Sequence, residues 1–186
     1  MTADADPTLA AEGRDALRPR GRKAQLESSK LRPGWTTGAC ACAAATSAFI
    51  ALHTGEFPDP VGIVLPGGRE VAFALTQSRL QPRQAMAAIT KDAGDDPDVT
   101  HGAIVRVVVE PGESGGGVSF AGGEGIGTVT LPGLPLPVGE PAINPKPREY
   151  ITTNITAAAE RLGVAPDVRV TVSIDDGARI AEKTWN

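Results

Sequence analysis

Polar and apolar residues alternate along several short segments of the chain, and this pattern predicts β-strands. The alternation is clearest in Ile104–Val109 and in Val168–Ile174, which are also rich in β-branched residues. Ala85–Thr90 is small and apolar and fits either a strand or a helix; we favour a strand because it leads directly into a polar loop. Four further segments are strand-like, and a Pro-Gly-Gly turn separates the first two as in a hairpin: Val61–Leu65, Glu70–Leu75, Val118–Phe120 and Ile126–Leu131.

Two longer segments predict helices. The first, about Ala39–His53, can be capped by Thr36 or Thr37, and its many alanines make it apolar on nearly every side, which is typical of a buried helix. The second, about Pro147–Leu162, has one apolar face and is closed by Gly163. A short helix is expected at about Asp176–Lys183. Many short strands with two longer helices predict an α+β fold, a two-layer α/β sandwich with a mixed or antiparallel sheet.

The first thirty residues differ from the rest of the chain. They mix charges, Ala, Pro and Ser without periodicity and contain few large aliphatic side chains. Such a composition cannot bury enough apolar surface to form a core. We therefore predict that residues 1–30 are a disordered extension and that residues 31–186 form one domain.

Charge and composition exclude several classes of protein. The chain has 18 Lys and Arg against 22 Asp and Glu, with no basic footprint for a nucleic acid. No run resembles a signal peptide, and no stretch approaches the roughly 18 apolar residues that span a membrane, which predicts a cytoplasmic protein. Cys40 and Cys42, the only cysteines, point to opposite sides of the predicted helix, so neither a disulfide nor a zinc site is expected.

The polar loop Lys91–Gly102 is the first candidate site. It holds four carboxylates, one ammonium and one of the two histidines of the chain, and Gly94 and Pro97 prevent a regular helix. A scaffold often carries its chemistry on such a loop, although a solvated acidic turn fits the composition equally well. The carboxylates lack the spacing of a calcium loop, so no metal site is predicted.

Three other segments offer ligand groups. Gly122–Gly127 is rich in glycine, but the chain continues as a predicted strand and not as a helix, which excludes a dinucleotide-binding fingerprint. Thr36-Thr37-Gly38 precedes the buried helix and offers hydroxyls and free backbone N–H groups, either as a plain N-cap or as a site for one carboxylate or phosphate. Gly139–Arg148 presents polar side chains between prolines, either towards a ligand or towards water.

These segments also carry a resemblance to a known family. Arg32–Cys42, Lys91–Gly102, Gly122–Leu134 and Gly139–Arg148 agree in order and spacing with motifs of the cobalt-precorrin-5B C1-methyltransferases, the CbiD-type enzymes of anaerobic cobalamin biosynthesis. The resemblance covers residues 32 to about 184 and implies a CbiD-like fold. Members of this family are about twice as long, so their C-terminal half is expected to be absent here.

The resemblance implies methyl transfer from S-adenosylmethionine to carbon 1 of cobalt-precorrin-5B, giving cobalt-precorrin-6A. Cobalt then arrives with the corrinoid substrate, and a homo-oligomer is compatible with the sequence; no nucleic acid or membrane is an expected partner. The alternative is a corrinoid-binding fragment that lacks the methyl-donor site.

The resemblance also orders the candidate residues by role. The general base is expected among Asp95, Asp96 and His101. Polar residues of the other segments are expected to bind the carboxylate-rich corrinoid: Thr36, Thr37, Lys91, Asp92, Asp98, Glu140, Asn144, Lys146 and Arg148. The glycine-rich turn is expected to bind the methyl donor, through Gly122, Gly123, Gly125 and Gly127.

Overall fold

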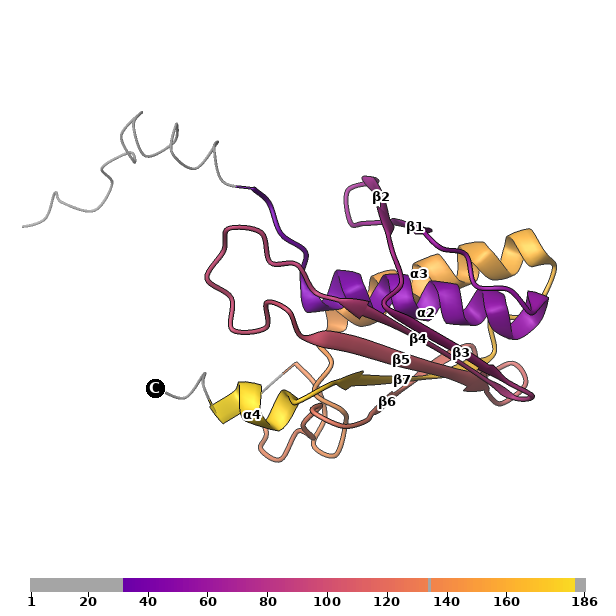
Figure 1. The fold of residues 1–186 in the computed structure, drawn as a ribbon. Helices are drawn as coiled ribbons and strands as arrows, with labels where there is room; N and C mark the ends of the chain where they lie inside the picture. The colour runs from indigo at the N-terminus through magenta and orange to yellow at the C-terminus, as the bar shows by residue number, and fades with distance from the viewer. Residues whose placement is uncertain (1–31, 134, 183–186) are drawn as a thin grey trace, which may run out of the picture. The chain divides into compact units, whose positions relative to one another are not determined.

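The computed structural model describes residues 32–133 and 135–182, and the extension predicted for residues 1–30 lies outside them. Its centre is a five-stranded sheet (Figure 1). In spatial order the strands are β3 (Gln77–Gln81), β4 (Gln84–Thr90), β5 (Ile104–Pro111), β7 (Val168–Ile174) and β6 (Val118–Gly122). Neighbours are antiparallel except β6 and β7, which are parallel, so the sheet is mixed as predicted.

The alternation in the sequence gives this sheet one buried face. In β5 and β7, valines alternate with partly exposed residues, and the register pairs Val107 with Val172 and Val109 with Val170. Directly paired residues point to the same face of a sheet. These valines are buried and form the core beneath the helices.

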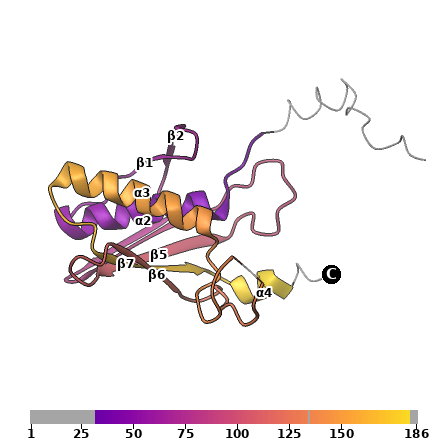
Figure 2. The same cartoon turned by 180° about the vertical axis from the view of Figure 1, so that it is seen from behind.

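Two long helices cover the buried face of the sheet, α2 (Thr37–Thr54) and α3 (Pro145–Leu162), as Figures 1 and 2 show from opposite sides. The antiparallel hairpin of β1 (Val61–Val64) and β2 (Glu70–Phe73) lies on the other side of the helices. A short helix, α4 (Gly177–Glu182), follows β7. The predicted α+β fold with sheet and helix layers is confirmed, and the hairpin adds a cover over the helices.

The all-round burial of α2 follows from these neighbours. α2 packs on β4 and β5, runs beside α3 and contacts β1. Its alanines let these neighbours approach closely, and nearly every residue of its first three turns is buried. Burial also raises the pKa of Cys40 to about 11 and that of Cys42 to about 12, so both thiols stay protonated and serve as packing groups in the core.

Within residues 32–133 and 135–182, one helix, α2, is long and apolar enough to cross a membrane by length and composition alone, which was not anticipated from the sequence. Its 18 residues have a mean hydropathy of 1.2, which meets the minimum for a membrane helix by length and composition. However, 67% of it is buried inside the domain. The core helix of a globular domain passes the same test, because it is enclosed by other apolar elements.

α2 is capped at both ends, and its N-terminal cap is the predicted Thr36. Thr36 has an extended backbone, and its Oγ1 accepts a hydrogen bond of 3.1 Å from the N–H of Ala39. At the other end Gly55 adopts a left-handed conformation, with φ of 87°, and donates to the carbonyl of Ala51. Gly163 closes α3 in the same way.

Two strand predictions need correction. Ile126–Leu131 is not a strand; Val129 is buried there because its N–H donates to the carbonyl of Glu140 and its carbonyl accepts from Gly139, a local loop-to-loop pairing. Conversely, β3 was not predicted. All five of its residues are exposed, so an edge strand of polar residues gives no alternation to detect.

Candidate functional site

A cavity of about 490 Å³ opens at the N-terminal end of α2. All four motif segments contribute to its wall, although they lie far apart in the chain. The first two segments supply Gly34, Trp35, Thr36, Thr37, Gly38, Ala41, Ala93, Asp96 and Asp98. The glycine-rich turn supplies Ile126, and the proline-rich segment supplies Ala142, Ile143, Asn144 and Pro147. Its floor includes Ile151, Val172 and Ile174.

The approach to α2 lies directly against the loop between β4 and β5. The N–H of Trp35 donates to the carbonyl of Asp92 at 2.7 Å, and Pro33 forms an isolated bridge with Gly94. A Cβ on Gly34 would lie 1.9 Å from the carbonyl carbon of Ala93. Only glycine therefore allows the two motif segments to form one edge of the cavity.

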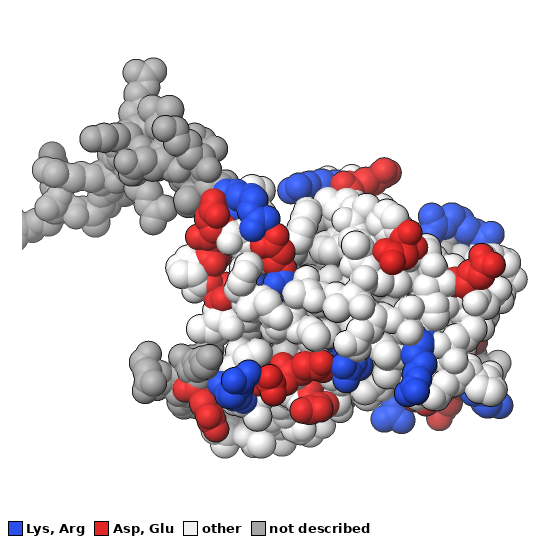
Figure 3. Space-filling view, viewed as in Figure 1, with Lys and Arg blue, Asp and Glu red and all other residues white. Residues whose placement is uncertain are grey.

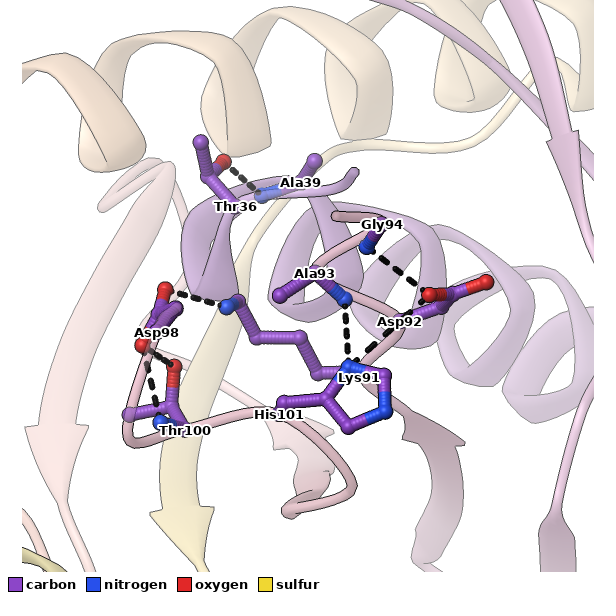
Figure 4. Close-up of polar contacts among 9 residues, drawn as sticks. All are labelled: Thr36, Ala39, Lys91, Asp92, Ala93, Gly94, Asp98, Thr100 and His101. Atoms are coloured by element: carbon purple, nitrogen blue, oxygen red, sulfur yellow. Dashed lines mark hydrogen bonds and ion pairs between the residues drawn. The ribbon is translucent and has the colours of Figure 1, made fainter. Parts of the chain in front are cut away.

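Lys91 and Asp98 form the central ion pair of the loop (Figure 4). Lys91 is 1% exposed, and its Nζ donates to the carboxylate of Asp98 at 2.5 Å. Thr100 donates to the same carboxylate through both its N–H and its hydroxyl. The Lys91 ammonium, followed by these Thr100 bonds, lowers the pKa of Asp98 to about 2. Asp98 is therefore a carboxylate at the cavity wall, and the buried ammonium of Lys91 fixes its position.

His101 and Asp92 shape the loop from outside the cavity wall (Figure 4). Nδ1 of His101 accepts a hydrogen bond of 3.1 Å from the N–H of Ala93, and Oδ1 of Asp92 accepts from the N–H of Gly94. With Nδ1 occupied as an acceptor, a neutral imidazole carries its proton on Nε2. His101 therefore has no free lone pair with which to accept a proton in this arrangement, which weakens its assignment as the general base.

Two polar side chains of the cavity wall have no partner within residues 32–133 and 135–182. The carboxylate of Asp96 makes neither a hydrogen bond nor an ion pair there. Asn144 precedes α3 as its N-cap residue, yet its side chain makes no capping hydrogen bond. At the adjacent end of α2, the N–H groups of Thr37 and Gly38 have no acceptor within the helix. The cavity thus presents one free carboxylate, one free amide and two backbone donors.

The acidic character of this end of the molecule is visible on the surface. Acidic side chains gather on the loop between β4 and β5, at the left of Figure 3. Of the described residues that line the cavity, only Asp96 and Asp98 carry a formal charge. Because the Asp98 charge is paired with the buried Lys91, the net negative charge of the wall comes from Asp96.

The remaining residues of the proline-rich segment are engaged inside the protein or face water. Arg148 donates to the carbonyls of Ile143 and Pro141 and to the carboxylate of Glu140, which lies 3.0 Å from Nη1. Its guanidinium also lies over the ring of Phe120. Lys146 is 80% exposed and pairs with Glu149, one turn along α3. None of these charged groups is among the residues that line the cavity.

The glycine-rich turn packs closely against β7 and α4. A Cβ on Gly123 would lie 2.2 Å from Oγ of Ser173, and one on Gly125 would lie 2.3 Å from the carbonyl oxygen of Ile174. The segment after the turn is irregular and not helical, which confirms that it is no dinucleotide-binding motif. Its contribution to the cavity is the side chain of Ile126.

The structure thus brings together five of the predicted site residues, Thr36, Thr37, Asp96, Asp98 and Asn144, in one cavity wall. Asp95 lies next to them on the loop but outside the wall. The sequence reasoning missed the apolar residues of the wall, among them Trp35, Ile126 and Ile143, because nothing in a periodic pattern separates a cavity-lining side chain from a core one. Across residues 32–133 and 135–182, no cluster of His, Cys, Asp and Glu could hold a metal ion.

Comparison with known proteins gives a consistent family. The CbiD family model matches residues 24–186. Relatives named cobalt-precorrin-5B C(1)-methyltransferase, from Brucella anthropi and Paramagnetospirillum magneticum, are 54% and 53% identical over 160 residues, which is 86% of this chain. These residues are 44% and 45% of the relatives' own lengths, so the chain spans less than half of each.

A solved structure agrees with the sequence relatives. The crystal structure of the cobalamin biosynthesis protein cbiD from Archaeoglobus fulgidus superposes with a TM-score of 0.62 at 30% sequence identity. The match covers 84% of this chain and 48% of that one. The same segments that build the cavity therefore occur within a shared sequence and a shared fold, and the chain belongs to the CbiD family.

Proposed function

We propose that this chain takes part in the methylation of carbon 1 of cobalt-precorrin-5B in cobalamin biosynthesis, with S-adenosylmethionine as the methyl donor. The observation that carries the proposal is the cavity of about 490 Å³, whose wall is built from all four motif segments. Its volume lies in the range of sites for small molecules. The names of relatives with 54% and 53% identity supply the reaction class.

The proposed reaction needs little covalent chemistry from the protein. The S–CH₃ bond of the sulfonium breaks with its electron pair returning to sulfur, while carbon 1 of the macrocycle supplies the pair for the new C–CH₃ bond. The macrocycle restores its charge by releasing a proton to a base. The protein's task is then to align donor and acceptor and to exclude water.

Among the three residues predicted as general base, the geometry favours Asp96. His101 uses its Nδ1 lone pair on the N–H of Ala93, and Asp95 lies outside the cavity wall. Asp96 lines the cavity and has no partner within residues 32–133 and 135–182. A proton acceptor must lie within reach of the group that releases the proton, and only Asp96 of the three faces the cavity.

A second candidate function rests on the extent of the chain. Because it spans 44% of the length of a named methyltransferase, the residues that complete the reaction could lie in the remaining part of such a protein. This chain would then bind one of the two reactants without transferring a methyl group. A macrocycle with its acetate and propionate side chains is also larger than the ligands that cavities of this size enclose.

A methyl-transfer assay separates the two candidates. The chain would be incubated with S-adenosylmethionine labelled in its methyl group and with cobalt-precorrin-5B, and the label in the corrinoid fraction would be counted. The proposal predicts label in the corrinoid, with turnover lowered at least about tenfold in Asp96→Asn, the lower range for loss of one general base. If a folded sample binds either reactant but transfers no methyl group, the second candidate, a binding fragment, would be the function.

A further inference from the structure

The charges of the cavity differ from those that a carboxylate-rich corrinoid would need. The two charged residues named in its wall are Asp96 and Asp98, and both are acidic. The cations that the sequence predicted for this substrate are absent from the wall: Arg148 and Lys146 lie elsewhere, and Lys91 is buried in its pair with Asp98. Like charges repel, so this cavity opposes a polycarboxylate and favours a ligand with positive charge.

S-adenosylmethionine has that charge. It carries a sulfonium and an ammonium against a single carboxylate, and so has a net positive charge at neutral pH. The carboxylate of Asp96, which has no partner within residues 32–133 and 135–182, is an acceptor for one of these cations, whereas the charge of Asp98 is already paired with Lys91. The apolar residues Trp35, Ile126 and Ile143 line the same cavity and offer contact surface to the uncharged parts of the donor.

The cavity also offers donors for the carboxylate of the ligand. The N–H groups of Thr37 and Gly38 are the first two of α2 and have no acceptor in the helix. The side-chain amide of Asn144 lies in the same wall without a capping hydrogen bond. These donors match the carboxylate at the amino-acid end of S-adenosylmethionine, which leaves the Asp96 carboxylate for the sulfonium.

We infer that this cavity is the methyl-donor site, with Asp96 as the carboxylate that recognises the sulfonium of S-adenosylmethionine. The inference rests on the proposed function and deepens it, because it assigns the cavity to the donor and not to the corrinoid. The sequence-based prediction placed the donor at the glycine-rich turn. Close packing against Ser173 and Ile174 accounts for the glycines at positions 123 and 125 without a ligand. The corrinoid then approaches from outside the cavity mouth.

Titration calorimetry with two ligands tests the inference. S-adenosylmethionine carries the sulfonium charge, whereas S-adenosylhomocysteine has the same zwitterionic end but a neutral sulfur. We expect Asp96→Asn to weaken binding of S-adenosylmethionine about two- to fivefold and to change binding of S-adenosylhomocysteine less, since an exposed charge pair contributes up to about 1 kcal/mol. Asp95→Asn is the matched control: it removes the same charge from the same loop, outside the cavity wall.

The outcomes distinguish this inference from the proposed function. Equal losses in Asp95→Asn and Asp96→Asn, or binding of S-adenosylmethionine that is unchanged in Asp96→Asn, would overturn the assignment of the donor to this cavity. Failure of a folded chain to bind either ligand would overturn it as well. Binding that depends on Asp96 without any methyl transfer to the corrinoid would support the donor site and reject the chain as a complete catalyst.

Discussion

At the scale of single residues, the Lys91–Asp98 pair gives the loop a defined dependence on pH. The Lys91 ammonium and the Thr100 bonds hold the pKa of Asp98 at about 2, below its ordinary value of 3.8. A carboxylate with a lowered pKa in the folded state stabilises the fold above its ordinary pKa, and this stabilisation is lost as the pH falls through about 2. Asp98→Asn should therefore lower the free energy of unfolding at neutral pH, by about 1–2 kcal/mol because the Asp98 side chain is partly exposed.

Urea unfolding of both proteins between pH 7 and pH 2 measures this effect. The difference between wild type and Asp98→Asn should be constant near neutral pH and should shrink below about pH 4. Glu149→Gln is the control, since its pair with Lys146 is exposed and contributes at most about 0.5 kcal/mol. A difference that persists unchanged at pH 2 would show that Asp98 acts through the hydrogen bonds that its two oxygens accept and not through its charge.

Arg148 provides a second prediction at this scale. The sequence predicted that its guanidinium binds the corrinoid, but the guanidinium donates to two backbone carbonyls and to Glu140 within the protein. Arg148→Ala should therefore cost about 1–3 kcal/mol of stability, because it leaves the carbonyls and a carboxylate without their donor. Lys146→Ala, on the neighbouring exposed turn, should change stability by less than about 0.5 kcal/mol.

Thermal or urea unfolding of the two variants gives the comparison. Equal stability of Arg148→Ala and Lys146→Ala would contradict the structural role of Arg148. If Arg148→Ala lost ligand binding without any loss of stability, the result would support the sequence-based assignment of Arg148 as a ligand-binding residue.

At the scale of elements, the contact of Gly34 with Ala93 holds the start of α2 against the loop after β4. A methyl group at position 34 would lie 1.9 Å from the backbone of Ala93, so the two segments must separate to accept it. We expect Gly34→Ala to cost roughly 3 kcal/mol or more and to weaken ligand binding, because the cavity wall opens. Gly62→Ala in β1 is the matched control, since a Cβ there meets nothing within 4 Å.

Circular dichroism and calorimetry would be measured on both variants. Gly62→Ala should unfold close to wild type and bind ligand normally. If Gly34→Ala did the same, the close approach of the two segments would have no part in forming the cavity.

The elements themselves were largely predictable from local pattern. The helices α2 and α3 were found because capping residues and glycines mark their ends, and β5 and β7 because their valines alternate. The errors arose in segments whose buried and exposed residues do not alternate with the period of a strand or a helix. β3 is an exposed edge strand, and Val129 is buried by a loop pairing with Gly139 and Glu140.

At the scale of the whole molecule, the four segments singled out in the sequence do meet in one cavity, but the sequence did not indicate which of their residues line it. Thr36, Asp96 and Asn144 meet in the cavity because the sheet and α2 bring distant segments together. Both Lys91 and Arg148 were expected from the sequence to bind the substrate. In the fold, Lys91 is buried and pairs with Asp98, and Arg148 pairs with Glu140. Whether a charge faces a ligand or a protein partner depends on tertiary contacts, which no local pattern contains.

The most direct test of the account is a nuclear magnetic resonance titration of the ¹⁵N-labelled chain with S-adenosylhomocysteine. The central claim is that the four motif segments form one cavity for the methyl donor. It predicts that the amide signals of Gly34, Gly38, Ala93 and Ile126 shift together with one dissociation constant, while those of the groove beside β1 and β2, such as Gly62 and Ala72, stay unchanged. Shifts confined to that groove, or no shifts at saturating ligand, would contradict the account.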